Sequence, residues 1–167
     1  GKLINLANRL AEMPLAGDVG IGHTRWATHG VPTENNAHPH TDGKVAVVHN
    51  GIIENYQEIK AELSCNGRAF ATDTDTEVIV HLVSDFLDQG KTPRDAVAAT
   101  LHRIEGALAL VIMIAGQHDV FFRARRGTPP AVGLGEGEVL RGSAAMVSSS
   151  LAHNLICCHE GDSAACT

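Results

Sequence analysis

Apolar residues recur at the three- and four-residue spacing of amphipathic helices in four segments of the chain. The first segment is residues 2–13, where Leu3, Leu6 and Leu10 form an apolar stripe that ends before Pro14. The second is residues 52–63, followed by an Asn-Gly pair that suits a helix end. The third predicted helix starts with Thr74 or Asp75 as its N-cap and stops at Gly90, and the fourth starts at Thr92-Pro93 and extends to Ile104.

Short apolar runs separated by glycines predict strands. They are expected at residues 19–27, 44–49, 107–114, 120–124, 131–134, 139–142 and 155–158, with a long polar loop at 28–43 between the first two. Helices in the middle of the chain and a meander of strands at its end favour a layered α+β fold over alternating βαβ units.

Length, charge and composition argue against nucleic-acid binding and against a membrane-spanning segment. The 167 residues are enough for one domain, and the net charge of −6, without a basic run, argues against nucleic acid as a partner. The longest apolar run, residues 107–115, is too short for the roughly 18 to 20 residues of a membrane span. The four cysteines show no C-x-x-C spacing, which favours reduced thiols and a cytoplasmic location.

Residues His49-Asn50-Gly51 stand at the junction of an apolar strand and a predicted helix. The Asn50 amide and the Gly51 N–H could together form an oxyanion hole, because glycine lets its own backbone approach a ligand closely. A plain connecting turn is the alternative interpretation of this tripeptide.

Three further stretches, at residues 23–30, 36–40 and 72–77, contain more polar side chains than a buried core requires. Arg25 beside Trp26, with Thr28 and His29 on the following loop, could clamp a ligand carboxylate; the alternative is a surface arginine stacked on a core tryptophan. Asp75 could hold a ligand ammonium group or could cap a helix.

The ten histidines raise the question of a metal site. His38-x-His40 and the acidic series Asp73-x-Asp75-x-Glu77 are the nearest candidates, but neither has an established zinc or calcium spacing. The glycines between 133 and 137 match neither a dinucleotide fingerprint nor a phosphate loop. We therefore expect no metal and no cofactor.

Four motifs together give the chain a family resemblance over residues 1 to about 162. They read GHTRWATHG at 22–30, NAHPH at 36–40, HNGIIEN at 49–55 and TDTEVI at 74–79. The chain resembles the glutaminase domains of glutamine–fructose-6-phosphate amidotransferases, which are class II amidotransferases with an N-terminal nucleophile. Purine-pathway amidotransferases share the second half of this pattern but differ at Arg25-Trp26 and His38.

The resemblance implies a fold and a site. The fold would be the four-layer αββα sandwich of N-terminal-nucleophile hydrolases, incomplete here, within a type 2 glutamine amidotransferase domain. Asn50 and Gly51 would form the oxyanion hole, and Asp75 would bind the glutamine α-ammonium. The family further implies that Arg25 binds the α-carboxylate with Thr28 and His29, that Trp26 acts as a lid, and that His38 supports the loop.

In this family the nucleophile is a cysteine at the very N-terminus, whereas residue 1 here is glycine. We therefore expect the chain to lack its N-terminal segment and the isomerase domains that bind fructose 6-phosphate. The expected function is glutamine amide hydrolysis for glucosamine 6-phosphate synthesis, with the chain alone inactive and the full-length parent able to form a homodimer. The alternatives are a non-catalytic glutamine- or glutamate-binding remnant and a histidine-rich metal-binding domain.

Overall fold

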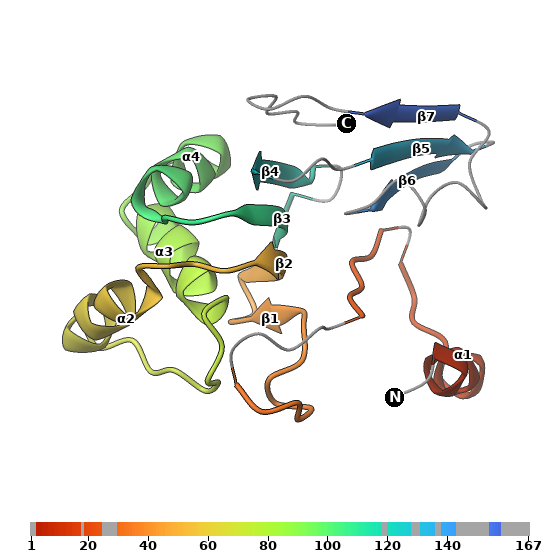
Figure 1. Cartoon of the computed structure of the whole chain (residues 1–167), viewed down its shortest axis with the longest axis horizontal. Helices are drawn as coiled ribbons and strands as arrows, with labels where there is room; N and C mark the ends of the chain where they lie inside the picture. The colour runs from red at the N-terminus through yellow and green to blue at the C-terminus, as the bar shows by residue number, and fades with distance from the viewer. Residues whose placement is uncertain are drawn as a thin grey trace.

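The computed structural model describes residues 3–17, 19–24, 30–117, 120–127, 131–135, 138–142 and 154–157. These residues form an α+β structure with two antiparallel sheets and four helices, which confirms the predicted fold class (Figure 1). The larger sheet carries the candidate site at the end of one strand.

The larger sheet has four strands in the order β1-β2-β3-β4. They are β1 (His40–Thr41), β2 (Val45–Gly51), β3 (Leu108–Ile114) and β4 (Phe122–Arg126). The central pair, β2 and β3, runs in register from Val45 opposite Ile114 to Gly51 opposite Leu108. Burial alternates along β3 as a strand covered on one face requires.

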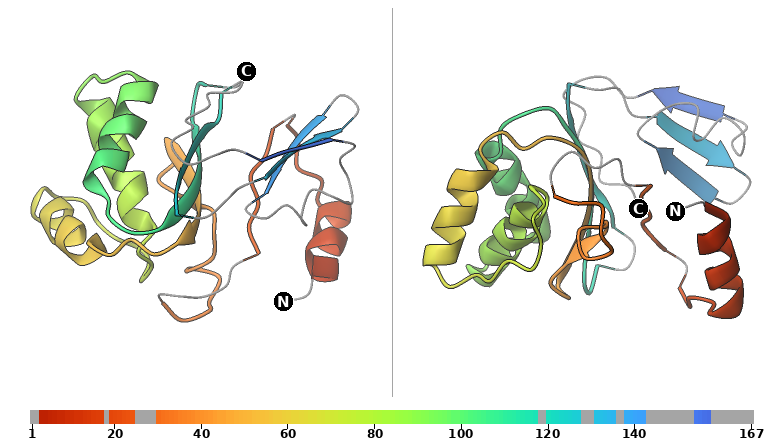
Figure 2. Two further views of the ribbon diagram at one scale, coloured as in Figure 1. Left: turned by 45° about the horizontal axis from the view of Figure 1, so that its top comes forward. Right: turned by 60° about the horizontal axis from the view of Figure 1, so that its bottom comes forward.

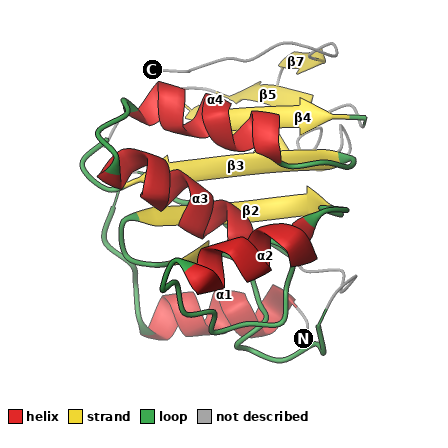
Figure 3. Cartoon of the chain, turned by 90° about the vertical axis from the view of Figure 1, so that its left-hand side faces the viewer, coloured by secondary structure: helices red, strands yellow, loops and turns green. Residues whose placement is uncertain are grey.

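Helices α2 (Tyr56–Cys65), α3 (Glu77–Asp88) and α4 (Pro93–Arg103) cover one face of this sheet (Figure 3). The core lies between the two layers, where Val45 and Val47 of β2 and Leu110 and Ile112 of β3 are almost fully buried. Central α3 is buried from Glu77 through Ser84, because it is enclosed by the sheet and the flanking helices.

The smaller sheet, in the order β6-β5-β7, contains β5 (Ala131–Gly135), β6 (Glu138–Gly142) and β7 (Asn154–Cys157). Figure 2 shows this sheet and α1 (Leu3–Glu12) on the side of the four-stranded sheet that faces away from α2, α3 and α4. Although α1 is amphipathic as predicted, none of its residues is buried.

Three predicted elements differ from the observed ones. Residues 19–24 are irregular instead of strand, and the loop 28–43 contains the two-residue strand β1. The helix predicted from residue 52 begins only at Tyr56. The reason is that the Ile52 and Glu54 N–H groups donate to the carbonyls of Ala107 and Glu105, which continues the pairing beyond β2.

Candidate functional site

Strand β2 ends on a glycine that no other residue could replace without distortion. Gly51 has φ +137°, and a Cβ added there would lie 2.1 Å from the Ala107 carbonyl oxygen. Gly106, on the segment before β3, has φ +112°, and its added Cβ would lie 2.2 Å from the Ile52 carbonyl oxygen. Two backbone segments therefore approach each other here at a distance that excludes side chains.

The Gly51 N–H points away from β3. The Ala115 N–H donates to the Lys44 carbonyl at 2.8 Å, and the Ile52 N–H donates to the Ala107 carbonyl at 3.1 Å. Every second residue from Lys44 to Ile52 is therefore in a hydrogen-bonded pair with the neighbouring chain of β3. Gly51 lies between two such residues, so Gly51 and Leu108 form a non-hydrogen-bonded pair. Because β1 pairs with β2 only at Ala46 and Val47, the Gly51 donor lies beyond the end of that pairing.

The neighbouring Asn50 side chain is exposed and hydrogen-bonds to a histidine of the described chain. Its Oδ1 lies 2.7 Å from Nε2 of His23, the second residue of the GHTRWATHG motif. Side chains alternate along β2, so Asn50 lies on the face opposite Val47 and His49, away from the helices. A backbone donor and a side-chain amide thus stand side by side at the strand end.

The Asp75 carboxylate lies directly behind this turn. It is 3% exposed, and its Oδ2 accepts a hydrogen bond from the Ile53 N–H at 2.8 Å. The prediction that Asp75 or Thr74 caps a helix is wrong, because α3 has Thr76 as its N-cap residue, without a side-chain cap bond. Asp75 instead ties the chain before α3 to the chain after Gly51.

Thr76 joins two histidines at the same junction. Its Oγ1 lies 3.1 Å from His38 Nε2 and 3.0 Å from His49 Nδ1. The His38 ring also packs against two other histidines: its centroid lies 4.4 Å from that of His23 and 4.7 Å from that of His40. Four histidines therefore gather around the end of β2.

Burial keeps His49 neutral. Its side chain is enclosed between the sheet and α3, and this burial lowers the pKa of His49 from its ordinary value of 6.5 to about 4. The Asp75 charge acts in the opposite direction, whereas His23 and His40 lower the pKa further. The site consequently holds an uncharged imidazole beside a carboxylate near neutral pH.

Two polar side chains fix the segment that carries Asp75. Burial raises the pKa of the Glu77 carboxyl, but hydrogen bonds from the Thr72 hydroxyl and the Ala71 and Thr72 N–H groups lower it overall, with a contribution from His81. Asn36, 2% exposed, accepts from the Asp73 N–H at 3.0 Å and donates to the Val31 carbonyl at 3.0 Å. These bonds hold residues 71–76 against the loop of the NAHPH motif.

The structure thus brings together four of the eight residues predicted from sequence: Asn50, Gly51, Asp75 and His38. The other four, Arg25, Trp26, Thr28 and His29, lie outside the described residues. The sequence assigned no contact to His23, Thr76 or Asn36, each of which has a partner 27 to 38 positions away. The only sign in the sequence that these three residues belong to the site was their place in polar motifs.

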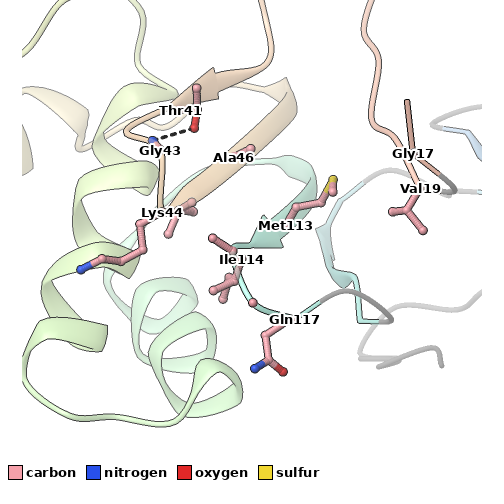
Figure 4. Close-up of a pocket in the computed structure, with 12 residues that line it drawn as sticks. Gly17, Val19, Thr41, Gly43, Lys44, Ala46, Met113, Ile114 and Gln117 are labelled. Carbon is pink, nitrogen blue, oxygen red and sulfur yellow. Dashed lines mark hydrogen bonds between the residues drawn. The ribbon is translucent and has the colours of Figure 1, made fainter. Parts of the chain in front are cut away.

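Other candidate features lie elsewhere. A cavity of about 530 Å³ lies between Gly17 and Val19 on one side and the opposite end of β2 on the other, and its lining includes Lys44, Ala46 and Met113 (Figure 4). Among the side chains that the structure describes, no three His, Cys, Asp or Glu residues form a group that could hold a metal ion. None of the helices in the described part of the chain has the length and hydrophobicity needed to cross a membrane.

Comparison with known proteins gives consistent matches. A family model described as a glutamine amidotransferase domain matches residues 11–156. A glutamine–fructose-6-phosphate aminotransferase [isomerizing] of Gluconobacter oxydans is 51% identical over 162 residues, which are 97% of this chain and 27% of that protein. The corresponding Brucella abortus protein is 50% identical over 167 residues, 100% of this chain and 28% of the relative. The chain thus spans about a quarter of the length of these relatives.

Solved structures agree with this assignment at the level of the fold. Glutamine phosphoribosylpyrophosphate amidotransferase from B. subtilis, complexed with ADP and GMP, superposes with a TM-score of 0.56 and 28% identity. The match covers 70% of this chain and 25% of that one. Because the family model covers most of the sequence, the chain belongs to the glutamine amidotransferase domain family.

Proposed function

We propose that the end of β2 is the glutamine site of a glutaminase domain, with Asn50 and Gly51 as the donors of its oxyanion hole. The observation that carries the proposal is the pair of donors: a Gly51 N–H directed away from β3, and an Asn50 amide whose oxygen already contacts His23. Family membership supports the same conclusion.

The two donors would act on the charge that develops during amide hydrolysis. A thiolate attacks the side-chain carbonyl carbon of glutamine, a C–S bond forms, and the carbonyl oxygen becomes an oxyanion that accepts from Asn50 Nδ2 and the Gly51 N–H. The C–N bond then breaks, and the nitrogen leaves as ammonia after taking up the proton that the thiol gave up. Water hydrolyses the remaining thioester to glutamate and restores the thiol. Removing one such donor typically lowers kcat by 10² to 10³.

The nucleophile is expected to be an N-terminal cysteine, as the family resemblance implies. Cys65 is a free cysteine that is exposed at the end of α2. Its free thiol is compatible with the expected cytoplasmic location. A glutamine- or glutamate-binding domain without turnover is the second candidate function, because the Asn50 amide and the buried Asp75 carboxylate would serve binding as well as catalysis.

The substrate groups would be distributed around the donor pair. Asp75 would bind the α-ammonium, and its buried negative charge behind the Gly51 turn supports that role. Arg25, with Thr28 and His29, would bind the α-carboxylate, Trp26 would cover the site, and His38 would support the loop through its contact with Thr76.

In the longer protein, this reaction would supply ammonia to fructose 6-phosphate bound by isomerase domains, in a homodimer. The relatives carry the name of that reaction and are about four times as long as the match. We further propose that the two sheets and their outer helices form the four-layer αββα sandwich of N-terminal-nucleophile hydrolases.

Titration calorimetry on the chain tests the substrate assignment. Wild-type protein should bind glutamine, and Asp75→Asn should weaken binding at least tenfold while keeping an oxygen that can accept from the Ile53 N–H. A glutamine analogue without the α-amino group should bind both proteins equally. Asp95→Asn, at the exposed start of α4, is the matched control.

Unchanged glutamine affinity in Asp75→Asn would remove Asp75 from the ammonium site, and no binding by the wild type would contradict the glutamine site as a whole. Ammonia release from glutamine, measured on the chain and on a form extended by a cysteine-led N-terminal segment, separates the glutaminase from the non-catalytic remnant.

A further inference from the structure

We propose that His23 is a positioning residue for the oxyanion hole: it holds the Asn50 side-chain amide in the one orientation in which its NH₂ group faces the reacting oxygen. The inference rests on the proposed function. An Asn side chain has a donor end and an acceptor end of nearly equal shape, so an oxyanion hole needs something that tells them apart.

The contact between His23 and Asn50 distinguishes the two ends of the Asn50 amide. His23 Nε2 lies 2.7 Å from Asn50 Oδ1, a distance typical of a strong hydrogen bond. If Nε2 carries the proton, it donates to Oδ1 and leaves Nδ2 pointing away from the ring. The opposite arrangement would direct Oδ1, an acceptor, at the oxyanion and would repel it.

The surroundings of the ring select the first arrangement. His23 Nδ1 is buried and has no hydrogen-bond partner in the described part of the chain. A proton on Nδ1 would therefore be a buried N–H without an acceptor, which proteins rarely tolerate, whereas an unpaired ring nitrogen without a proton costs less. The neutral ring is thus favoured in the form that carries its proton on Nε2.

The ring is also held in place from behind. It packs against His38 with centroids 4.4 Å apart and a tilt of 40°, and His38 is fixed by its 3.1 Å contact with Thr76 at the start of α3. The orientation of the Asn50 amide is therefore set by a series of contacts that runs from α3 through two rings to the end of β2.

A kinetic experiment on the natural full-length protein tests this role. His23→Ala should lower kcat for ammonia release by about ten- to a hundredfold, less than the loss of a whole donor, and should leave KM within about twofold. His23→Gln offers an amide N–H at a similar reach and should restore most of kcat. His102→Ala, exposed on α4, is the control and should behave as wild type.

Full kcat in His23→Ala, equal kcat in the Ala and Gln variants, or a raised KM with unchanged kcat would each overturn the proposal. If the wild type releases no ammonia, the proposed function fails, and nitrogen NMR on the chain decides the inference by itself. We expect His23 to carry its proton on Nε2 and the Asn50 NH₂ resonances to shift in His23→Ala. A proton on Nδ1, or unshifted Asn50 resonances, would contradict it.

Discussion

Gly51 shows how one residue can serve the fold and the chemistry together. Its φ of +137° and its approach to the Ala107 carbonyl leave no space for a side chain. The same backbone geometry turns its N–H away from β3 and toward the proposed substrate. The residue is therefore constrained twice, by the packing of the turn and by the direction of its donor.

Substituting Gly51 should therefore be costly. We expect Gly51→Ala to lower the free energy of unfolding by at least about 2 kcal/mol, because strain at a disfavoured φ adds to a backbone clash. Gly116→Ala is the matched control: it has φ +82° but no atom within 4 Å of the added Cβ, so it should cost only about 1 kcal/mol. Urea unfolding measures both, and equal losses in the two variants would contradict the role assigned to the Ala107 contact.

Single-residue chemistry was partly readable from the sequence. The types and place of Asn50 and Gly51 at a strand end suggested a donor pair, and that role stays a prediction. The contacts of His23 with Asn50 and of Asp75 with Ile53 could not be predicted from the sequence, because the partners are 27 and 22 positions apart. An aspartate before a helix fits a cap equally well, and only the tertiary structure shows that Asp75 bonds across to the Ile53 N–H.

The junction of β2 and α3 is the element-scale feature that supports the site. His49 of β2 and Thr76 before α3 meet at 3.0 Å in the interior, and Asp75 bonds to the chain just after β2. The helix start and the strand end are thus joined by two polar contacts. Any charge placed on His49 would be buried in this junction.

That junction should make stability depend on pH. The pKa of His49 is about 4 in the folded chain and 6.5 in its ordinary state, so the unfolded chain binds more protons between these values. The contribution of the neutral His49 ring to the free energy of unfolding is fully present above pH 6.5. It falls by roughly 3 kcal/mol in total as the pH is lowered from 6.5 toward 4.

Unfolding free energies measured between pH 4 and 7 test this expectation. His49→Asn keeps a polar atom near the position of Nδ1 and should flatten the pH dependence, even if it lowers stability overall. His102→Asn, on the exposed face of α4, should leave the slope of the wild type. A wild-type slope in His49→Asn would assign the pH dependence to other groups.

Periodicity was a good guide to long elements and a poor one to short or paired segments. The spacing of apolar residues predicted α1, α3 and α4 with boundaries close to those observed, and also β3. It failed at β1, which is only two residues long and polar, and at residues 52–55, where apolar spacing fits a helix but the backbone pairs with the chain before β3. Pairing across the sheet is decided by residues that are distant in the sequence.

At the scale of the whole molecule, the arrangement places the Asn50 side chain on the sheet face that the helices leave uncovered. Asn50 lies on the side of the four-stranded sheet that faces the smaller sheet and α1 (Figure 2). The amphipathic pattern of α1 could be read from the sequence, but its contacts could not, since its apolar residues Leu3, Leu6 and Leu10 are all exposed. Periodicity indicates that a helix has an apolar face without specifying what covers it.

The most direct test of the central claim is the response of the Asn50 and Gly51 amide resonances to glutamine in a nuclear magnetic resonance titration of the chain. We expect the Asn50 side-chain NH₂ and the Gly51 N–H to shift together, saturably, while Gly116 at the opposite end of the β2–β3 pair stays unchanged. Glutamine-dependent shifts confined to the cavity near Lys44 and Met113, or none at all, would contradict the placement of the glutamine site at the end of β2.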